Sequence, residues 1–414
     1  LPAGGGTEKG TKIKRPDFRS FFSGVLPLFT VAHFGHHVVG ALLRPMLPFI
    51  RRDFGLDYTR IASLQSAYAL TGGISQLPSG WLADRFGPRI IVTVSVAGVA
   101  LAGVGIGLSP GFTALVAFFM LAAVMEGGYH PASAAAISSS VSSKTRGRSL
   151  GIHLIGGSSA FWIIPLVAAE TSRYWGWRGS YIALAIPAVA LGIAIFVALG
   201  RRARTSDIEK RVAEVERPAR RPPIPWRRLA PFIVMTIATG TVVQSVFGFI
   251  SLIAVDNFGL SEAAAARLVA ITPGIGLVAA PLGGYLSDRL GQVPVMLTVS
   301  FLAIPVIYWL GVAPNVATLV AVMIVMGLVT NIRMPTSEAY IVGHTPEGRR
   351  STVLGAYYFA SRETGGVLAL VVGRMIDRLG LQRTTGYLSA ALAVITVVGT
   401  LLLWRNHGVT RKNI

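Results

Sequence analysis

The chain has 414 residues, of which 52% are hydrophobic and only 14% are charged. Soluble domains average about 25% charged residues, so the composition excludes an ordinary soluble domain and favours a membrane protein. The formal net charge of +20 would suggest nucleic-acid binding in a soluble protein. Here the basic residues lie mostly in short loops and tails, where the positive-inside rule places them, so we expect no nucleic-acid partner.

Twelve apolar stretches follow a polar tail at residues 1–20. Each is long enough to cross about 30 Å of hydrocarbon as a helix, and a helix satisfies its own backbone hydrogen bonds, which lipid cannot do. The expected spans are residues 21–50, 60–83, 90–108, 112–140, 149–169, 180–200, 230–255, 264–287, 293–311, 315–341, 352–373 and 384–404. The sequence therefore predicts an all-α integral membrane protein with twelve transmembrane helices.

The spans fall into two groups of six, separated by a basic linker at residues 201–229. We expect an N-terminal bundle at residues 21–200, a C-terminal bundle at residues 230–404 and a tail at residues 405–414. Basic residues concentrate in the tails, the linker and the loops of one side, so we expect both termini in the cytoplasm and the protein in the inner (plasma) membrane. The linker is expected to touch anionic lipid headgroups.

One motif occurs in both halves of the chain. Residues 80–87 read Gly-Trp-Leu-Ala-Asp-Arg-Phe-Gly, and residues 284–291 read Gly-Tyr-Leu-Ser-Asp-Arg-Leu-Gly. The same offset also aligns Pro131 with Pro335, Arg146 with Arg350, Leu150 with Leu354 and Gly151 with Gly355. We infer that the halves are parallel repeats of six helices, an architecture that membrane transporters use.

The motif resembles the loop after the second helix in the major facilitator superfamily, and the resemblance covers essentially the whole chain. The family pattern is Gly-x-Leu-Ala-Asp-Arg-x-Gly-Arg-Lys/Arg, which residues 80–89 match except that Pro88 takes the first basic position. In the second copy, Gln292 and Val293 stand where the basic residues would be. The resemblance implies a secondary active transporter that works by alternating access, with a central site between the halves.

The charged residues of both motif copies are candidate gating residues. In relatives, this loop latches the halves together when the cytoplasmic side is closed, so the resemblance implies the same role here. A carboxylate at such a helix end can also pair with Arg or with the positive end of a neighbouring helix. The expected gating residues are Asp84, Arg85, Arg89, Asp288 and Arg289. The alternative is a charged turn that only sets the topology.

A second resemblance is to the fosmidomycin-resistance type of exporter. It rests on His33-Phe34 in the first span and on Gly-Gly-Tyr-His-Pro-Ala at residues 127–132 in the fourth. It implies export by proton antiport. Such proteins often carry an Asp shortly after the His-Phe pair, where this chain has His36 and His37, so the role of that Asp cannot be carried over.

Ionisable side chains inside a span are costly and mark candidate sites. The first span carries His33, His36, His37 and Arg44, which fall within roughly a 100° arc of one helix. We expect His33, His37 and Arg44 to line a substrate cavity, with Gln244 of the seventh span as a further polar contact. The alternative for Arg44 is to snorkel to the outer surface.

The fourth span carries Glu126 and His130, spaced i to i+4 on one face of the helix. A carboxyl and an imidazole at this spacing could exchange a proton near the middle of the membrane. We expect Glu126 to be the proton carrier and His130 its modulator. The alternative is a hydrogen bond between helices with a structural role.

The tenth and eleventh spans carry Arg333, Glu338, Arg362 and Glu363. Adjacent residues on one helix do not face each other, so we expect cross-helix pairs such as Arg333–Glu363 or Arg362–Glu338. In the functional interpretation, Arg333 and Arg362 bind substrate, and the two carboxylates take part in proton coupling. The alternative is that these pairs are structural salt bridges.

Other kinds of site are not supported by the sequence. His33 and His37 have helical spacing, but no second carboxylate or Cys motif accompanies them, so we expect no metal site. There is no phosphate-cradling Gly-x-x-x-x-Gly-Lys loop, so we expect no ATP use and no cofactor, with the proton gradient as the energy source. We place no nucleophile, base and orienting group together, and we do not expect an enzyme.

The candidate groups in the spans include more Arg and His side chains than carboxylates, which favours an anionic or amphipathic substrate over a lipophilic cation. We therefore expect a monomeric, proton-coupled exporter of a small anionic or amphipathic organic compound. The alternative is a proton-coupled uptake symporter for a small organic or inorganic anion. An alternative of another class is a transporter-like sensor or assembly partner that does not transport.

Overall fold

The computed structural model describes residues 26–140, 146–203, 223–346 and 350–411. The regular elements in these ranges are all helices. The N-terminal half contains α2 (Leu26–Phe54), α3 (Tyr58–Gly107), α4 (Phe112–Glu126), α5 (Tyr129–Ser140) and α6 (Arg146–Ala203). The C-terminal half contains α8 (Trp226–Phe247), α9 (Ile250–Phe258), α10 (Glu262–Leu268), α11 (Ile271–Leu290), α12 (Gln292–Val312), α13 (Val316–His344), α14 (Arg350–Leu379) and α15 (Leu381–Arg411).

Both copies of the repeated motif end in a turn that only glycine adopts easily. Gly87 has a φ of 79° and divides α3 into two legs, and Gly291 has a φ of 89° between α11 and α12. A positive φ costs other L-residues energy because of their Cβ atom. Gly176 divides α6 in the same way, with a φ of 65°. The repeated sequence therefore specifies a repeated turn between helices.

Eight helices in the described part of the chain are long and apolar enough to cross a membrane, judged by length and composition. With α3 and α6 divided at their glycines, the helical segments follow the order of the expected spans. The fourth, seventh and eighth expected spans are each broken into two helices, α4 with α5, α8 with α9 and α10 with α11. The all-α membrane fold is confirmed, and the count of twelve spans stays a prediction. Residues 204–222 of the predicted linker lie outside the described residues.

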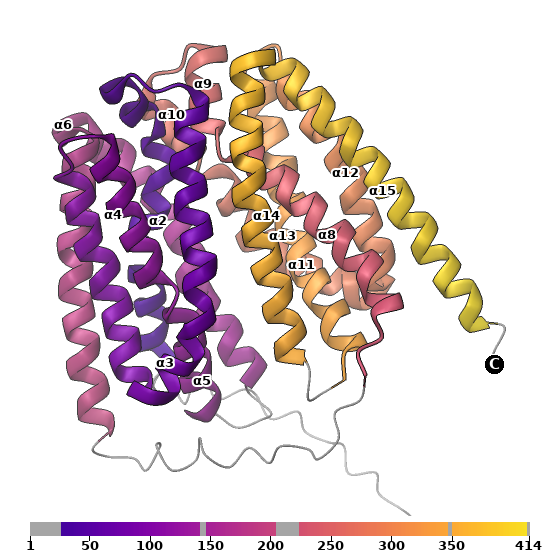
Figure 1. The fold of residues 1–414 in the computed structure, drawn as a ribbon, viewed down its shortest axis with the longest axis horizontal. Helices are drawn as coiled ribbons and strands as arrows, with labels where there is room; N and C mark the ends of the chain where they lie inside the picture. Colours follow the sequence, from indigo (N-terminus) through magenta and orange to yellow (C-terminus); the bar gives the residue numbers. More distant parts are fainter. Residues whose placement is uncertain (1–25, 141–145, 204–222, 347–349, 412–414) are drawn as a thin grey trace, which may run out of the picture.

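The two halves form two helical bundles that lie side by side and meet near α9 and α10 (Figure 1). From there they diverge toward the opposite end of the molecule, where α5 and the start of α14 lie. The main contact between the halves joins α3 to α14. Gly373 of α14 packs so closely on α3 that an added Cβ would overlap with the carbonyl oxygen of Tyr58 and the Cβ of Ala62. Small residues allow such close helix packing within membranes.

Ion pairs join the halves at the end where the bundles meet, which we call the closed end. The pairs are Arg51–Asp256, Arg52–Glu262 and Arg267–Glu170. The Tyr58 hydroxyl also donates to Asp256 at 2.8 Å. Asp377 of α14 accepts from the backbone N–H groups of Tyr58 and Thr59 at 3.0 and 2.7 Å, so a side chain of the C-terminal half caps the first turn of α3.

Candidate functional site

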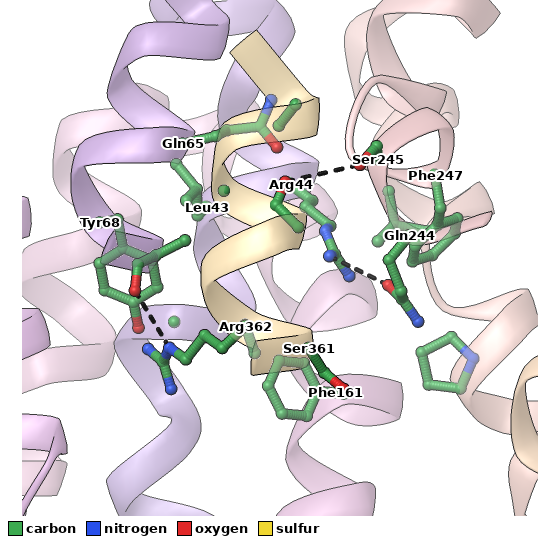
Figure 2. Close-up of a pocket in the computed structure, with 18 of the residues that line it drawn as sticks. Leu43, Arg44, Gln65, Tyr68, Phe161, Gln244, Ser245, Phe247, Ser361 and Arg362 are labelled. Carbon is green, nitrogen blue, oxygen red and sulfur yellow. Dashed lines mark hydrogen bonds between the residues drawn. The ribbon is translucent and has the colours of Figure 1, made fainter. Parts of the chain in front are cut away.

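A cavity of about 430 Å³ lies between the two halves. Its walls come from α2, α3, α4 and α6 of the N-terminal half and from α8, α11 and α14 of the C-terminal half. The larger polar side chains in the lining include Arg44, Gln65, Tyr68, Glu126, Gln244 and Arg362. Figure 2 shows Arg44 pointing across the cavity to Gln244, and the Arg362 side chain extending toward Tyr68.

An ion pair connects the halves inside this cavity. Arg362 of α14 donates through Nη2 to Oε2 of Glu126 at 3.4 Å and through Nε to the carbonyl oxygen of Ala69 at 3.3 Å. The Tyr68 hydroxyl donates to the same Glu126 oxygen at 2.6 Å. The guanidinium crosses α3 over Gly72, where a Cβ would overlap with Arg362 Nη2. The path of Arg362 therefore depends on the missing side chain at Gly72.

The second cation of the cavity is Arg44 of α2. It donates through Nη2 to Oε1 of Gln244 at 3.2 Å, and its guanidinium carbon lies 4.9 Å from the centre of the Phe247 ring. The Ser251 hydroxyl donates to the Arg44 carbonyl oxygen at 2.6 Å. Arg44 and Gln244 therefore line the cavity together, as expected from the sequence, and Arg44 does not snorkel to the surface.

The histidines of α2 are not among the residues that line the cavity. His33 and His37 point into the N-terminal half, where their rings lie 5.1 and 5.5 Å from the ring of His130. His37 approaches the cavity through two lining residues, with 3.7 Å between its Nδ1 and Oε1 of Glu126 and 4.9 Å between its ring and the ring of Phe161. The expected cavity-lining role of His33 and His37 is therefore wrong for this conformation, because the histidine face of α2 packs against α5 and α6.

The expected Glu126–His130 pair is also not formed, and the fourth span is not one continuous helix. α4 ends at Glu126 and α5 begins at Tyr129. A Cβ on Gly127 would overlap with Ser75 of α3, so the missing side chain at this position lets α3 and the fourth span approach closely. Glu126 then interacts with Tyr68, Arg362 and His37, as described above, and His130 turns toward the histidines of α2.

The two cross-helix pairs expected for the tenth and eleventh spans are wrong as well. Arg333 donates through Nη1 to the carbonyl oxygen and hydroxyl of Thr236, both at 3.1 Å, and to the Tyr357 hydroxyl at 3.0 Å. It is half-buried within the C-terminal half and does not line the cavity. Arg362 pairs with Glu126 instead of with Glu338.

The carboxylates of these spans also lie outside the cavity lining. Glu338 interacts with the Tyr358 hydroxyl. Glu363 lies against Gly73 of α3, where a Cβ would overlap with its Oε1, and that buried oxygen has no hydrogen-bond partner in the structure. The rotation of α13 and α14 about their axes, which the sequence does not reveal, sets these positions.

The family of the chain is established by comparison with known proteins. A family model described as the Major Facilitator Superfamily matches residues 29–362, with a second match at residues 232–413. The chain belongs to the Major Facilitator Superfamily. It is therefore an integral membrane protein and a secondary transporter rather than an enzyme, as the sequence predicted.

The superfamily relatives differ in what they are named for. A "Probable L-galactonate transporter" of Escherichia coli (strain K12) is 29% identical, over 48% of this chain and 42% of that protein, so the match spans less than half of its length. The "Multidrug resistance protein MdtG" of Proteus mirabilis (strain HI4320) is 24% identical over 91% of this chain and 95% of that protein. Among solved structures, a POT family transporter has a TM-score of 0.77 at 15% identity, covering 91% of this chain and 95% of that chain. This likeness shows the superfamily fold.

The expected gating residues lie at the end opposite the closed end, which we call the linker end. Arg85 lies over the Trp81 ring at 5.3 Å, and Arg89 donates to the carbonyl oxygen of Phe196 at 3.1 Å. In the second motif, Arg289 donates to the Tyr285 hydroxyl at 2.8 Å, and Asp288 is exposed. The Asp84 side chain lies outside the described part of the chain. These contacts stay within one half, so they do not form a latch between the halves.

Sequence reasoning missed two residues of α3 that shape the cavity. Tyr68 holds Glu126, and the Gln65 side chain lies so close to Gly248 that a Cβ there would overlap with its amide oxygen. Both are uncharged, so a search for charges inside the spans does not find them. Their i, i+3 spacing places both on one face of the span, and this is the signal that could have identified them.

Proposed function

We propose that this transporter is a proton-coupled exporter of a small organic anion, which binds in the cavity between the halves. The observation that carries the proposal is the charge of the lining, where Arg44 and Arg362 face a single carboxylate, Glu126. Guanidinium groups bind carboxylates and phosphonates through paired, charge-assisted hydrogen bonds. The cavity of about 430 Å³ lies in the size range of small-molecule sites.

Arg362 and Glu126 link proton and substrate to the arrangement of the halves, because one belongs to α14 and the other to α4. The Glu126 carboxylate and a bound anion compete for Arg362. Anion binding therefore changes the ion pair that joins the halves and is linked to the protonation state of Glu126. We assign Glu126 as the proton carrier and His37, whose Nδ1 lies 3.7 Å from it, as the neighbouring group in place of His130.

The proposal includes an orientation in the inner (plasma) membrane. The linker end, with the basic residues Arg85, Arg89 and Arg289, faces the cytoplasm under the positive-inside rule. The closed end then faces outward, and the described conformation is the inward-facing one of an alternating-access cycle. We propose that the protein works as a monomer.

The names of two relatives support different parts of this proposal. The "Probable L-galactonate transporter" supports an organic anion, because galactonate is a carboxylate, and the name "Multidrug resistance protein" fits export. Uptake by proton symport is the second candidate, because an anion site serves transport in either direction.

Flux into liposomes containing the purified protein tests substrate class and direction together. Sugar acids, other carboxylates and phosphonates are compared with lipophilic cations under an imposed pH gradient. Antiport predicts accumulation of an anion when the liposome interior is acidic, whereas symport predicts it when the interior is alkaline. Arg362→Gln should lower the flux about 100-fold. Arg378→Gln changes an exposed residue of the same helix and should retain the flux. Flux of cations without flux of any anion would contradict the proposal.

A further inference from the structure

Five of the seven histidines in the chain gather inside the N-terminal half. His33, His36 and His37 come from α2, His130 from α5 and His153 from α6. The rings of His33 and His153 stack at 4.3 Å, and those of His36 and His37 lie 4.6 Å apart. His33, His36, His37 and His153 are each at most 8% exposed. The cluster lies behind Glu126 and outside the cavity lining, so the proposed anion transport does not use it as a substrate site.

Three of these side chains bring ring nitrogens together. The Nε2 atoms of His33 and His37 lie 3.2 Å apart, and one ring nitrogen from each of His33, His37 and His130 lies within 4.8 Å of the other two. Two imidazole nitrogens bound to one tetrahedral Zn²⁺ at its usual bond length lie about 3.3 Å apart. The spacing of His33 and His37 therefore already matches two positions of a tetrahedral site.

The hydrogen bonds around His33 leave its Nε2 ready to bind a cation. Its Nδ1–H donates to the carbonyl oxygen of His153 at 2.9 Å. A carbonyl oxygen can only accept, so the proton of the neutral ring is on Nδ1 and Nε2 carries a lone pair. Metal-ligating histidines usually donate their other ring N–H to a backbone carbonyl or a carboxylate in this way.

His37 has the corresponding carboxylate. Its Nδ1 faces Oε1 of Glu126 at 3.7 Å and has no hydrogen-bond partner in the structure. Oε2 of Glu126 already accepts from Tyr68 and Arg362, so Oε1 remains directed at His37. In the absence of metal, the Nε2–H of His37 donates to Nε2 of His33; when metal binds, the proton moves to Nδ1 beside Glu126.

The unpaired nitrogens of the cluster argue against simple ring packing. His36 Nε2, His37 Nδ1 and His153 Nδ1 are all buried without a hydrogen-bond partner in the structure. Buried polar atoms without partners are uncommon and costly. Of these three nitrogens, His37 Nδ1 gains a partner when a cation binds at Nε2, because the ring proton then lies on Nδ1 beside Glu126; His36 Nε2 and His153 Nδ1 lie outside the proposed ligand set.

We propose that His33, His37 and His130 bind one divalent transition-metal ion of the Zn²⁺ class through their ring nitrogens. The carbonyl oxygen of His153 and the carboxylate of Glu126 orient two of the ligands. Imidazole ligands favour Zn²⁺, Co²⁺, Ni²⁺ and Cu²⁺ over Mg²⁺ and Ca²⁺, which prefer oxygen. The helical spacing of His33 and His37 alone does not predict this site, because the third ligand comes from α5.

Metal titration of the purified full chain, free of any histidine tag, tests the proposal without a transport assay. Zn²⁺ binding is followed by calorimetry, and Co²⁺ binding by the visible absorption of the tetrahedral ion. We expect one equivalent of metal, and no binding of Mg²⁺ in place of it. His37→Ala and the double variant His33→Gln/His37→Gln should weaken binding at least tenfold. His344→Ala, at the end of α13, is the matched control and should bind as the wild type does.

X-ray absorption spectroscopy of the Zn²⁺-loaded wild type gives a second measurement that does not depend on how the variants fold. We expect a first shell with imidazole scattering from three ligands. Failure to bind one equivalent, undiminished binding in the double variant, or a first shell of oxygen ligands would each overturn the proposal. None of these outcomes bears on anion flux, so the metal site and the proposed function fail independently.

Discussion

The two halves share a turn motif but differ in the chemistry of their interiors. In the N-terminal half, the buried polar groups include imidazoles gathered beside Glu126 as well as serine hydroxyls. In the C-terminal half, they are mostly hydroxyls around Arg333, such as the Thr236–Ser337 pair at 2.5 Å and the Thr239–Ser300 pair at 3.0 Å. The comparison indicates that the repeat conserves backbone geometry, whereas groups that change charge near neutral pH have gathered in one half.

The largest expected effect distinguishes the two interior arginines. Arg362→Gln removes the only described ion pair in the cavity that joins the halves, and should lower anion flux by about 100-fold through loss of a charge-assisted contact of about 3 kcal/mol. Arg333→Gln leaves Thr236 and Tyr357 without their donor. It should lower the melting temperature by several degrees, at a cost of about 1–3 kcal/mol, while flux per folded molecule is retained. Equal loss of flux in both variants would contradict the distinction.

Proton coupling should also differ between the halves. Glu126→Gln keeps a hydrogen-bonding side chain in the cavity but cannot take up or release a proton. Its remaining flux should no longer respond to the pH gradient, although exchange of anion for anion should persist. Glu338→Gln, inside the C-terminal half, should keep the gradient response. Anion flux into liposomes at several imposed pH gradients measures this response in both variants. If flux through Glu126→Gln still responded to the pH gradient, Glu126 would not be the proton carrier.

A smaller effect is expected from the contact that lets Arg362 reach the other half. Gly72→Ala places a Cβ where the guanidinium now lies, so Arg362 should turn away from Glu126 and flux should fall about tenfold, as for the loss of a weaker charged hydrogen bond. Gly355→Ala on α14 is the control, because an added Cβ there meets no atom within 4 Å. Wild-type flux in Gly72→Ala would show that the path over α3 is not required.

The smallest effect is expected from the motif carboxylates, because the two bundles diverge toward the linker end (Figure 1). Asp84→Asn and Asp288→Asn should leave stability almost unchanged and shift the population toward the inward-facing state. The chain contains no Cys, so single cysteines introduced at the linker end can report that population by their labelling rates. If Asp84→Asn left the conformational populations and the flux unchanged, the latch role would be contradicted. The motif would then be a charged turn that only sets the topology.

The fold was predictable because its signals are local. Apolar length, the basic loops and the duplicated motif specify spans, order and repeat, and the glycines of the motif mark turns that need a positive φ. The break between α4 and α5 was not predicted. The close packing of Gly127 on Ser75 was not predicted either, because it is a contact between distant segments.

The sequence allowed some of the cavity residues to be predicted, but not which of their side chains contact each other. Arg44 and Gln244 were identified by polarity within apolar spans. The pairing of Arg362 with Glu126 depends on the rotation of α14 against α3 and on the open path at Gly72, and sequence patterns within single helices contain neither. The same holds for His130, whose position relative to α2 follows from the break in the fourth span.

Asp377 of the C-terminal half caps the first turn of α3, so the hydrogen bonding of two backbone N–H groups depends on whether the halves are in contact at the closed end. When the closed end separates, the backbone N–H groups of Tyr58 and Thr59 lose Asp377 as their acceptor. The N–H of Arg60 donates at 2.7 Å to Asp57, which belongs to the same half, so this hydrogen bond remains. Hydrogen exchange at residues 58 and 59 should therefore follow the opening of the transporter, with residue 60 as the internal reference. The first turn of α3 thus contains an unlabelled reporter of the conformational equilibrium.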